Sequence, residues 1–129
     1  MKDRPFDRDL VLPRLDQGFR AMVPHNAALG LRVVDCGPTM CAMVLPWAEH
    51  LVGDPDRDVL HGGPITTLLD ACGGASVFLA LGSPVPIATL DLRIDYLKTA
   101  SPRRDVQARC ECYKLGRNAH PWPYAAVGV

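Results

Sequence analysis

One stretch decides the fold of this chain: His61-Gly62-Gly63-Pro64-Ile65-Thr66-Thr67-Leu68-Leu69-Asp70. It opens a segment, residues 59–90, in which Asp70 is the only Asp, Glu, Lys or Arg. Apolar residues recur there at helical spacing on several sides, which is typical of a buried helix. The glycine pair gives a tight turn with exposed backbone N–H groups, and proline suits the first helical turn. We therefore predict a buried helix, from Gly63 or Pro64 to Leu81, with one carboxylate about two turns from its start.

The single carboxylate of this helix has two interpretations. Burying it is costly unless it is paired or hydrogen-bonded, so backbone groups or the hydroxyls of Thr66 and Thr67 could cap it in a purely structural role. Alternatively, Asp70 is a base or nucleophile in a cleft, and the Gly62 and Gly63 amides donate to a developing oxyanion. In the second case both functional parts lie on one rigid element.

A resemblance to a known family rests on three features of this region. They are His61-Gly62-Gly63, then Asp70 after six further residues, then the alternating segment Thr89-Leu90-Asp91-Leu92-Arg93-Ile94-Asp95-Tyr96-Leu97. Together they resemble the hotdog-fold acyl-CoA thioesterases of the phenylacetate-pathway (PaaI-like) type. The resemblance covers roughly residues 29–116 and implies an α+β fold in which an antiparallel sheet wraps one long helix.

The resemblance also implies roles for individual residues. Asp70 is expected to be the catalytic carboxylate, acting as general base on water or as nucleophile, and the Gly62 amide to polarise the thioester carbonyl. His61 would fix the loop, and the Thr89 hydroxyl would contact the carboxylate or the water. Sites of this family form at a dimer interface, so we expect a homodimer or homotetramer in which Asp70 lies near the partner's Gly62.

The implied substrate is a small or medium acyl- or aryl-CoA. Its phosphates would need basic groups, and its acyl chain an apolar lining beside the glycine loop. The candidates for the phosphates are Arg93, Lys98, Arg103, Arg104 and Arg117. The candidates for the acyl chain and the loop are Val77, Phe78, Leu81 and Gly63.

Two features depart from the family pattern. Several members carry Asn or Gln six residues before the histidine, where it helps to hold the nucleophilic water, and this chain has Pro55 there. His25 or Asn26 could replace it in space. Family members usually continue with another strand where this sequence ends, in the apolar run 127–129. These departures keep open a non-catalytic acyl-CoA-binding protein. A hotdog-fold hydratase or dehydratase, which uses a histidine and an acid together, is the other alternative, and the histidine nine residues before the acid fits it less well than a thioesterase.

Length and composition narrow the function further. A chain of 129 residues predicts one domain, and its formal net charge of zero argues against a nucleic-acid or anionic-membrane partner. The charged N-terminus lacks the apolar core of a signal peptide, and helix-breaking residues interrupt the apolar runs, so we expect a cytoplasmic protein without a membrane span. The five cysteines are expected to be buried free thiols. A zinc site at Cys110, Cys112 and His120 is disfavoured by spacing, and no metal or cofactor is expected.

The expected elements follow from periodicity and from breakers. A leader (1–12) precedes a helix (13–23) and a turn (24–30). Strands are predicted at 29–35, 39–45, 89–97, 105–113 and 119–129, with a polar loop at 47–58 and the long helix between the second and third strands. Gly73-Gly74 inside that helix would be costly without a reason, which predicts a close approach by a sheet or a second helix.

Overall fold

The computed structural model describes residues 5–83, 85–116 and 124–128. Its elements in chain order are α1 (Arg8–Met22), α2 (Pro24–Ala28), β1 (Arg32–Cys36), β2 (Met40–Leu45), η1 (Glu49–Leu51), β3 (Val52–Asp54), β4 (Val59–Leu60), α3 (Gly62–Leu81), β5 (Val106–Gly116) and β6 (Tyr124–Gly128). The predicted last strand lies partly outside the described residues, because 117–123 and 129 are not among them.

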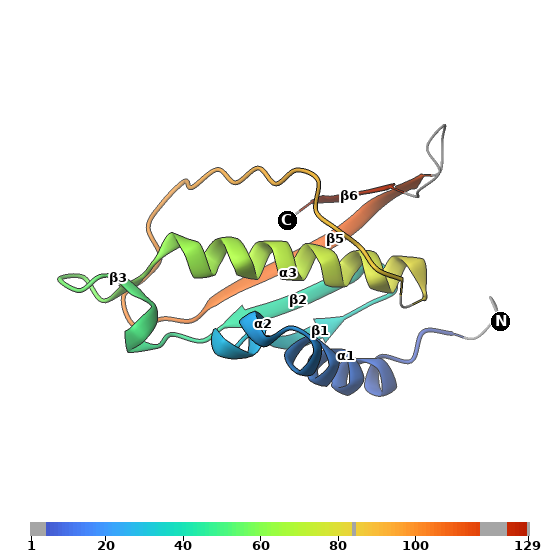
Figure 1. The fold of residues 1–129 in the computed structure, drawn as a ribbon, viewed down its shortest axis with the longest axis horizontal. Helices are drawn as coiled ribbons and strands as arrows, with labels where there is room; N and C mark the ends of the chain where they lie inside the picture. Colours follow the sequence, from blue (N-terminus) through green and yellow to red (C-terminus); the bar gives the residue numbers. More distant parts are fainter. Residues whose placement is uncertain (1–4, 84, 117–123, 129) are drawn as a thin grey trace.

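An antiparallel sheet and one long helix form the body of the molecule. The sheet has the strand order β1-β2-β5-β6, and β3 pairs with β4 in a separate hairpin. Figure 1 shows α3 lying across β2 and β5, with α1 and α2 along one side of it and residues 85–100 arching over another. The predicted α+β architecture of a sheet against a single long helix is therefore confirmed.

The core lies between α3 and the two central strands. On β2 the alternate residues Cys41, Met43 and Leu45 are buried, and they pair in register with Cys110, Ala108 and Val106 of β5. From α3 the buried side chains are Leu68, Cys72, Ala75 and Ser76. The predicted alternation of residues 105–113 is confirmed, since Ala108, Cys110 and Cys112 face inward.

The prediction of a helix buried on all sides was wrong for this single chain. One face of α3 packs on the sheet, whereas Asp70 is exposed and most other positions are only half-buried. Within the described residues α3 is the one helix long and apolar enough to span a membrane by length and composition. Its packed face on β2 and β5 is that of a core helix.

The glycine pair of α3 has neighbours within the chain. A Cβ atom on Gly73 would lie 3.7 Å from Val127 Cγ1 of β6, and one on Gly74 would lie 3.4 Å from Ile87 Cδ1. The missing side chains thus let β6 and the segment after α3 approach the helix closely. The predicted close approach of the sheet is confirmed at Gly73. At Gly74 the neighbour is an extended segment of the chain, where a second helix was the other prediction.

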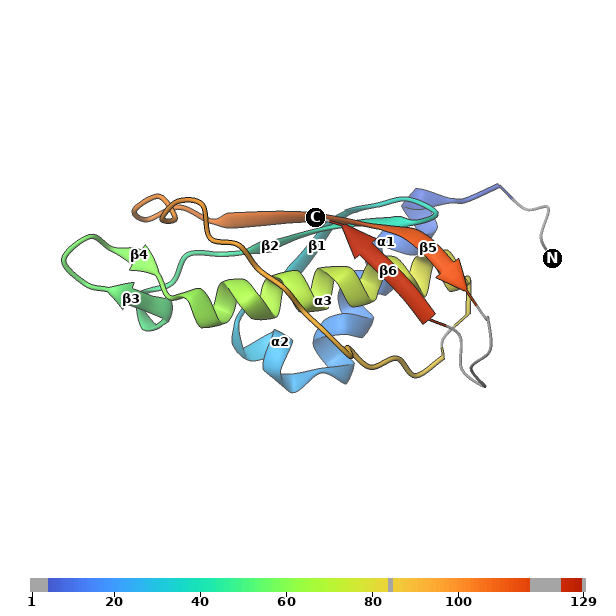
Figure 2. The ribbon, with the colours of Figure 1, turned by 90° about the horizontal axis from the view of Figure 1, so that it is seen from above.

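Residues 85–100, called the crossing segment below, do not form the predicted strand 89–97. They run without secondary structure across α3 (Figure 2). The apolar row of the predicted alternation, Leu90, Leu92, Ile94 and Tyr96, is not a buried face, since Leu90 is 96% exposed and Tyr96 57%. A strand forms only where a neighbour offers its backbone N–H and C=O groups. Here side chains anchor the segment on α3 instead, with Ile87 at Gly74 and Thr89 at Asp70.

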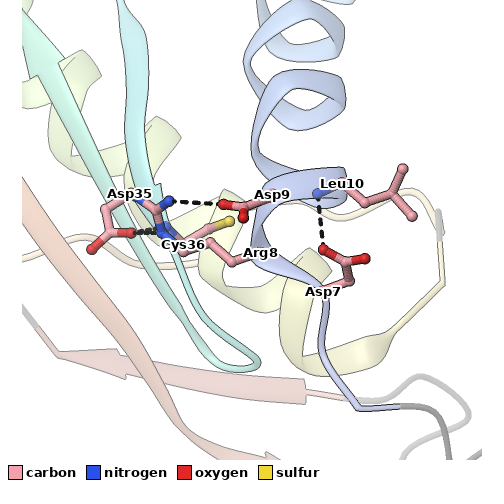
Figure 3. A network of polar contacts seen from close by, with 6 residues as sticks. All are labelled: Asp7, Arg8, Asp9, Leu10, Asp35 and Cys36. Carbon is pink, nitrogen blue, oxygen red and sulfur yellow. Dashed lines mark hydrogen bonds and ion pairs between the residues drawn. The ribbon is translucent and has the colours of Figure 1, made fainter.

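The N-terminal helix begins earlier than the predicted boundary of residue 13. Asp7 caps α1 by accepting from the Leu10 N–H at 3.1 Å, and Pro13, read from the sequence as a helix start, lies inside the helix. Arg8 joins the start of α1 to β1 through an ion pair with Asp35 (Nε to Oδ1, 2.6 Å), and Figure 3 shows this network. Residues 8–12 are therefore helix, not leader.

Two predicted loops also contain short elements. Residues 24–28, expected as part of a turn, form α2, and the polar loop 47–58 contains η1, β3 and the turn before β4. Trp47 Nε1 donates to Asp58 O at 3.0 Å, and Arg103 pairs with the Asp58 carboxylate at 2.8 Å. These long-range contacts hold the hairpin in place, and no local pattern reports them.

Asp16 of α1 binds the edge strand β1 of the sheet. Its carboxylate accepts from the Val33 N–H of β1 at 2.9 Å and pairs with Arg32 (3.0 Å) and Arg20 (3.1 Å). Burial by itself raises the pKa of Asp16. The hydrogen bonds from Arg32 and Val33 and the two nearby charges outweigh that effect and hold the pKa below its usual value.

We expect Asp16→Ala to lower the free energy of unfolding at neutral pH by about 1–3 kcal/mol, because the Val33 N–H and Arg32 lose their acceptor. A folded-state pKa below the unfolded value of about 3.9 stabilises the fold above that pH, and this contribution is lost as pH falls through the folded pKa. The difference between parent and variant in urea titrations should therefore shrink below about pH 4. Asp9→Asn, at an exposed residue, is the control. A difference that stays constant into acid would contradict the assignment.

Candidate active site at the start of the central helix

His61 shapes the N-terminus of α3. It is the N-cap residue, with extended backbone (φ −64°, ψ 148°), and its Nδ1 accepts from the Gly63 N–H at 2.8 Å. Because Nδ1 is the acceptor, the ring proton of a neutral His61 lies on Nε2. The histidine thus holds the glycine loop in its turn.

The two glycine amides, both considered as oxyanion donors from the sequence, are not equivalent. The Gly63 N–H is engaged by His61, whereas no hydrogen bond among the described residues uses the Gly62 N–H. Gly62 is the first residue of α3, so its N–H points out of the helix end, where the helix dipole favours negative charge. The structure therefore leaves Gly62 as the available donor.

Asp70 is held by the segment that crosses α3. Thr89 Oγ1 donates to Asp70 Oδ1 at 2.6 Å, a short charge-assisted hydrogen bond. No hydrogen bond among the described residues uses the second carboxylate oxygen, and the side chain is exposed. Thr66 and Thr67, considered as structural caps for this carboxylate, bond elsewhere. The geometry orients a carboxylate with one free oxygen.

Tyr96 and Thr66 form a contact that the sequence did not indicate. Tyr96 Oη lies 2.9 Å from Thr66 Oγ1 and donates to the Gly62 carbonyl at 3.1 Å. In the alternating segment 89–97, Tyr96 shares one face of the predicted strand with Leu90 and Leu92. A phenol takes a hydrogen-bond partner as a rule when it is buried, but Tyr96 is 57% exposed, so its residue type gave no signal for this contact.

Of the two residues considered as substitutes for the missing Asn or Gln, His25 reaches α3. Its Nε2 lies 3.3 Å from Thr67 Oγ1, which in turn donates to the Gly63 carbonyl at 3.3 Å. Asn26 is buried within α2. His25 therefore contacts α3 at Thr67, in the second turn of the helix.

The basic candidates for phosphate binding have different environments. Arg93 pairs with Asp95 at 3.3 Å on the crossing segment, and Lys98 is exposed on the same segment. Arg103 is engaged by Asp58 and lies 5.6 Å from the centre of the Trp47 ring. Arg104 is exposed, and Arg117 lies outside the described residues.

The apolar candidates lie on α3 without enclosing a pocket. Phe78 packs edge-on against Phe19 of α1, with ring centres 6.0 Å apart, and Val77 and Leu81 are half-buried. The best-defined surface depressions of the described residues lie elsewhere, one along residues 5–10 and one between α1 and β1. Phe78 therefore packs against α1, and neither of these two depressions of the described residues lies at the apolar candidates of α3.

The five cysteines are free and buried, as predicted. The hydrogen bond with Cys110 lowers the pKa of Cys72, but the contact with Cys41 and burial outweigh it and raise that pKa to about 12. The pKa of Cys110 is also raised, by its contact with Cys72 and by burial. Such thiols are unreactive at neutral pH. No group of three potential metal ligands gathers among the described residues.

The comparisons with known proteins identify the class to which this fold and site belong. The model of the thioesterase superfamily matches residues 58–124, more than half of the chain, and this range contains His61, Gly62, Asp70 and Thr89. The chain therefore belongs to the thioesterase superfamily, and its sheet and central helix are those of the hotdog fold.

Individual relatives agree with this assignment. A protein from Pseudomonas aeruginosa with a known crystal structure is 34% identical, with a TM-score of 0.70 over 89% of this chain and 87% of its own. A curated protein from Halobacterium salinarum, provisionally named an esterase, is 35% identical over 91 residues, or 68% of this chain, and the match spans 59% of that relative's length. The phenylacetic acid degradation protein PaaI from Thermus thermophilus, 24% identical, shares the fold with a TM-score of 0.61 over 73% of this chain and 76% of its own.

Proposed function

We propose that this protein is a cytoplasmic acyl-CoA thioesterase that hydrolyses a small or medium acyl- or aryl-CoA to the free acid and CoA, without metal or cofactor. The observation that carries the proposal is the uncommitted Gly62 N–H at the N-terminus of α3, beside a Gly63 N–H that His61 engages. Superfamily membership and the orientation of Asp70 by Thr89 support it.

In the proposed reaction the free oxygen of Asp70 takes a proton from water, and the resulting hydroxide attacks the thioester carbon. The carbonyl oxygen becomes an oxyanion that accepts from the Gly62 N–H. Collapse of the tetrahedral intermediate breaks the carbon–sulfur bond, and the CoA thiolate leaves with the proton from Asp70. Attack by Asp70 itself, with an anhydride that water later cleaves, uses the same two groups. Thr89 keeps the carboxylate oriented in both cases.

One chain does not bring these two groups to the same substrate. Gly62 and Asp70 are eight positions apart on α3, which corresponds to about 12 Å along the helix axis. A reacting carbonyl needs its oxyanion donor and its attacking group within about 3 Å. A second copy that places its own helix alongside would meet this requirement, so we propose a homodimer, or a homotetramer built from it, as the active form.

We expect two inactive variants to restore activity to each other when they are co-expressed. In a mixed dimer of Asp70→Asn with Gly62→Pro, one site carries both defects and the other carries none. Random pairing should therefore recover about a quarter of the parent activity. The measurement is the turnover of the co-purified mixture against each variant alone, with sedimentation to show the assembly state. A monomeric parent, or a mixture no more active than its parts, would contradict shared sites.

The hydratase or dehydratase alternative fits the structure less well. Those enzymes use a histidine and an acid together. Here His61 and Asp70 are nine positions apart on the cap and helix, about 13 Å, and the His61 Nδ1 is already engaged by Gly63. The non-catalytic binder has the same fold and is separated from the enzyme only by turnover.

A panel of acyl-CoA thioesters with short, medium and aryl acyl groups tests the proposal. Release of free thiol above the uncatalysed rate supports a thioesterase and orders the acyl groups by kcat/KM. Loss of enoyl absorbance without thiol release would indicate a hydratase. Binding of the same compounds without turnover would indicate a binding protein. Either of these last two results would overturn the proposal.

A further inference from the structure

Tyr96 reaches the first turn of α3 from the crossing segment. Its hydroxyl lies 2.9 Å from Thr66 Oγ1 and donates to the Gly62 carbonyl at 3.1 Å. A phenol has one proton to give, so the bond to Gly62 uses it, and the contact with Thr66 then requires the Thr66 hydroxyl to be the donor. The Thr66 hydroxyl therefore donates to Tyr96 Oη, and the Tyr96 hydroxyl donates to the Gly62 carbonyl.

This contact acts where the backbone is least constrained. Gly62 and Gly63 are adjacent glycines at a helix end, and each has more backbone freedom than any other residue type. His61 Nδ1 accepts the Gly63 N–H and Tyr96 donates to the Gly62 carbonyl, so both contacts fix the peptide plane between Gly62 and Gly63. The preceding plane carries the Gly62 N–H and joins the fixed plane at the Gly62 Cα. Before it in the chain, the His61 N–H donates to the Leu51 carbonyl at 2.9 Å, so the backbone is held on both sides of the Gly62 N–H. A Cβ on Gly62 would be 3.4 Å from Tyr96 Oη, so glycine leaves room for the phenol.

We propose that Tyr96 is a positioning residue that, through the Gly62 carbonyl and with Thr66 as its donor, holds the Gly62 N–H in the direction needed by the oxyanion. This inference rests on the proposed function, since the oxyanion donor is the Gly62 N–H. Oxyanion donors work because they are oriented before the charge develops. Loss of the phenol hydroxyl should therefore weaken binding of the transition state more than binding of the substrate.

Tyr96→Phe removes only the hydroxyl. We expect kcat to fall about 5–10-fold, the range of one neutral hydrogen bond, with KM within about twofold of the parent. Thr66→Val should lower kcat in the same direction, and Thr66→Ser, which keeps the hydroxyl, should restore it. The matched control is Tyr113→Phe on β5, where the tyrosine is 70% exposed, and this variant should match the parent. A variant that raises KM alone would show that Tyr96 contacts substrate and would overturn a positioning role.

A second measurement does not depend on turnover. In ¹⁵N spectra, Tyr96→Phe should shift the Gly62 and Gly63 amide resonances and lower the Gly62 order parameter, while Tyr113→Phe leaves both unchanged. Inactive parent protein with these spectral changes would refute the proposed thioesterase but keep the role of Tyr96. Folded Tyr96→Phe protein with unchanged glycine amides and unchanged kcat would overturn the role of Tyr96 and keep the thioesterase.

Discussion

Asp70→Asn should lower single-turnover hydrolysis by about 10²–10⁴-fold, the usual cost of losing a general base. Asparagine keeps the shape and an oxygen that can accept from Thr89 Oγ1, but it cannot take a proton from water. Because Asp70 is exposed in the chain, the substitution relieves little desolvation, and thermal stability should stay within about 0.5 kcal/mol of the parent. Substrate binding should persist.

Asp91→Asn is the matched control for this experiment. It removes the same charge from an exposed position on the segment that carries Thr89. Melting curves and single-turnover CoA release on the same samples give the answer. A destabilised but fully active Asp70→Asn protein would assign Asp70 a structural role and remove the base from the proposed reaction.

Gly62→Pro should lower kcat by about 10²–10³-fold, the typical effect of losing one oxyanion donor. The structure indicates that this variant folds. Gly62 is the first residue of α3, where proline is well tolerated, and His61 already has the extended backbone that a following proline requires. The missing N–H is one that no described hydrogen bond uses.

Gly62→Ala separates the lost donor from the added carbon. Alanine places a Cβ 3.4 Å from Tyr96 Oη, as proline does, but it keeps the N–H. We expect alanine to retain much of the activity that proline loses, with steady-state kinetics and melting curves measured on both. Equal and large losses in both variants would show that crowding of Tyr96 is responsible. An active Gly62→Pro protein would move the oxyanion site away from Gly62.

The helix and the central strands were predictable because their signals are local. The glycine pair, the proline and the apolar spacing specify the start of α3 to within two residues. The alternation in β5 specifies its inward face, and the turn at Gly37 closes the hairpin between β1 and β2. In each case the information lies within a few residues of the structure that it specifies.

The structure of the crossing segment could not be predicted from its local sequence pattern. Residues 89–97 have a clear strand pattern, but pairing depends on a neighbour with a free backbone edge, and the pattern does not report one. The contacts of Thr89 and Tyr96 with α3 depend instead on how the chain returns over the helix. For the same reason the role of Thr89 came only from the family resemblance, and the contact of Tyr96 with Gly62 was missed.

The crossing segment also has a consequence for communication between sites. It contacts Asp70 through Thr89 and the Gly62 residue through Tyr96, so a single stretch of chain supports both groups. In the proposed dimer these two groups serve different substrates. Local unfolding of one segment would then loosen the base of one site and the oxyanion donor of the other in a single event, and ordering it at one site would favour order at the other. The two active sites would share a conformational equilibrium although no residue need touch both substrates.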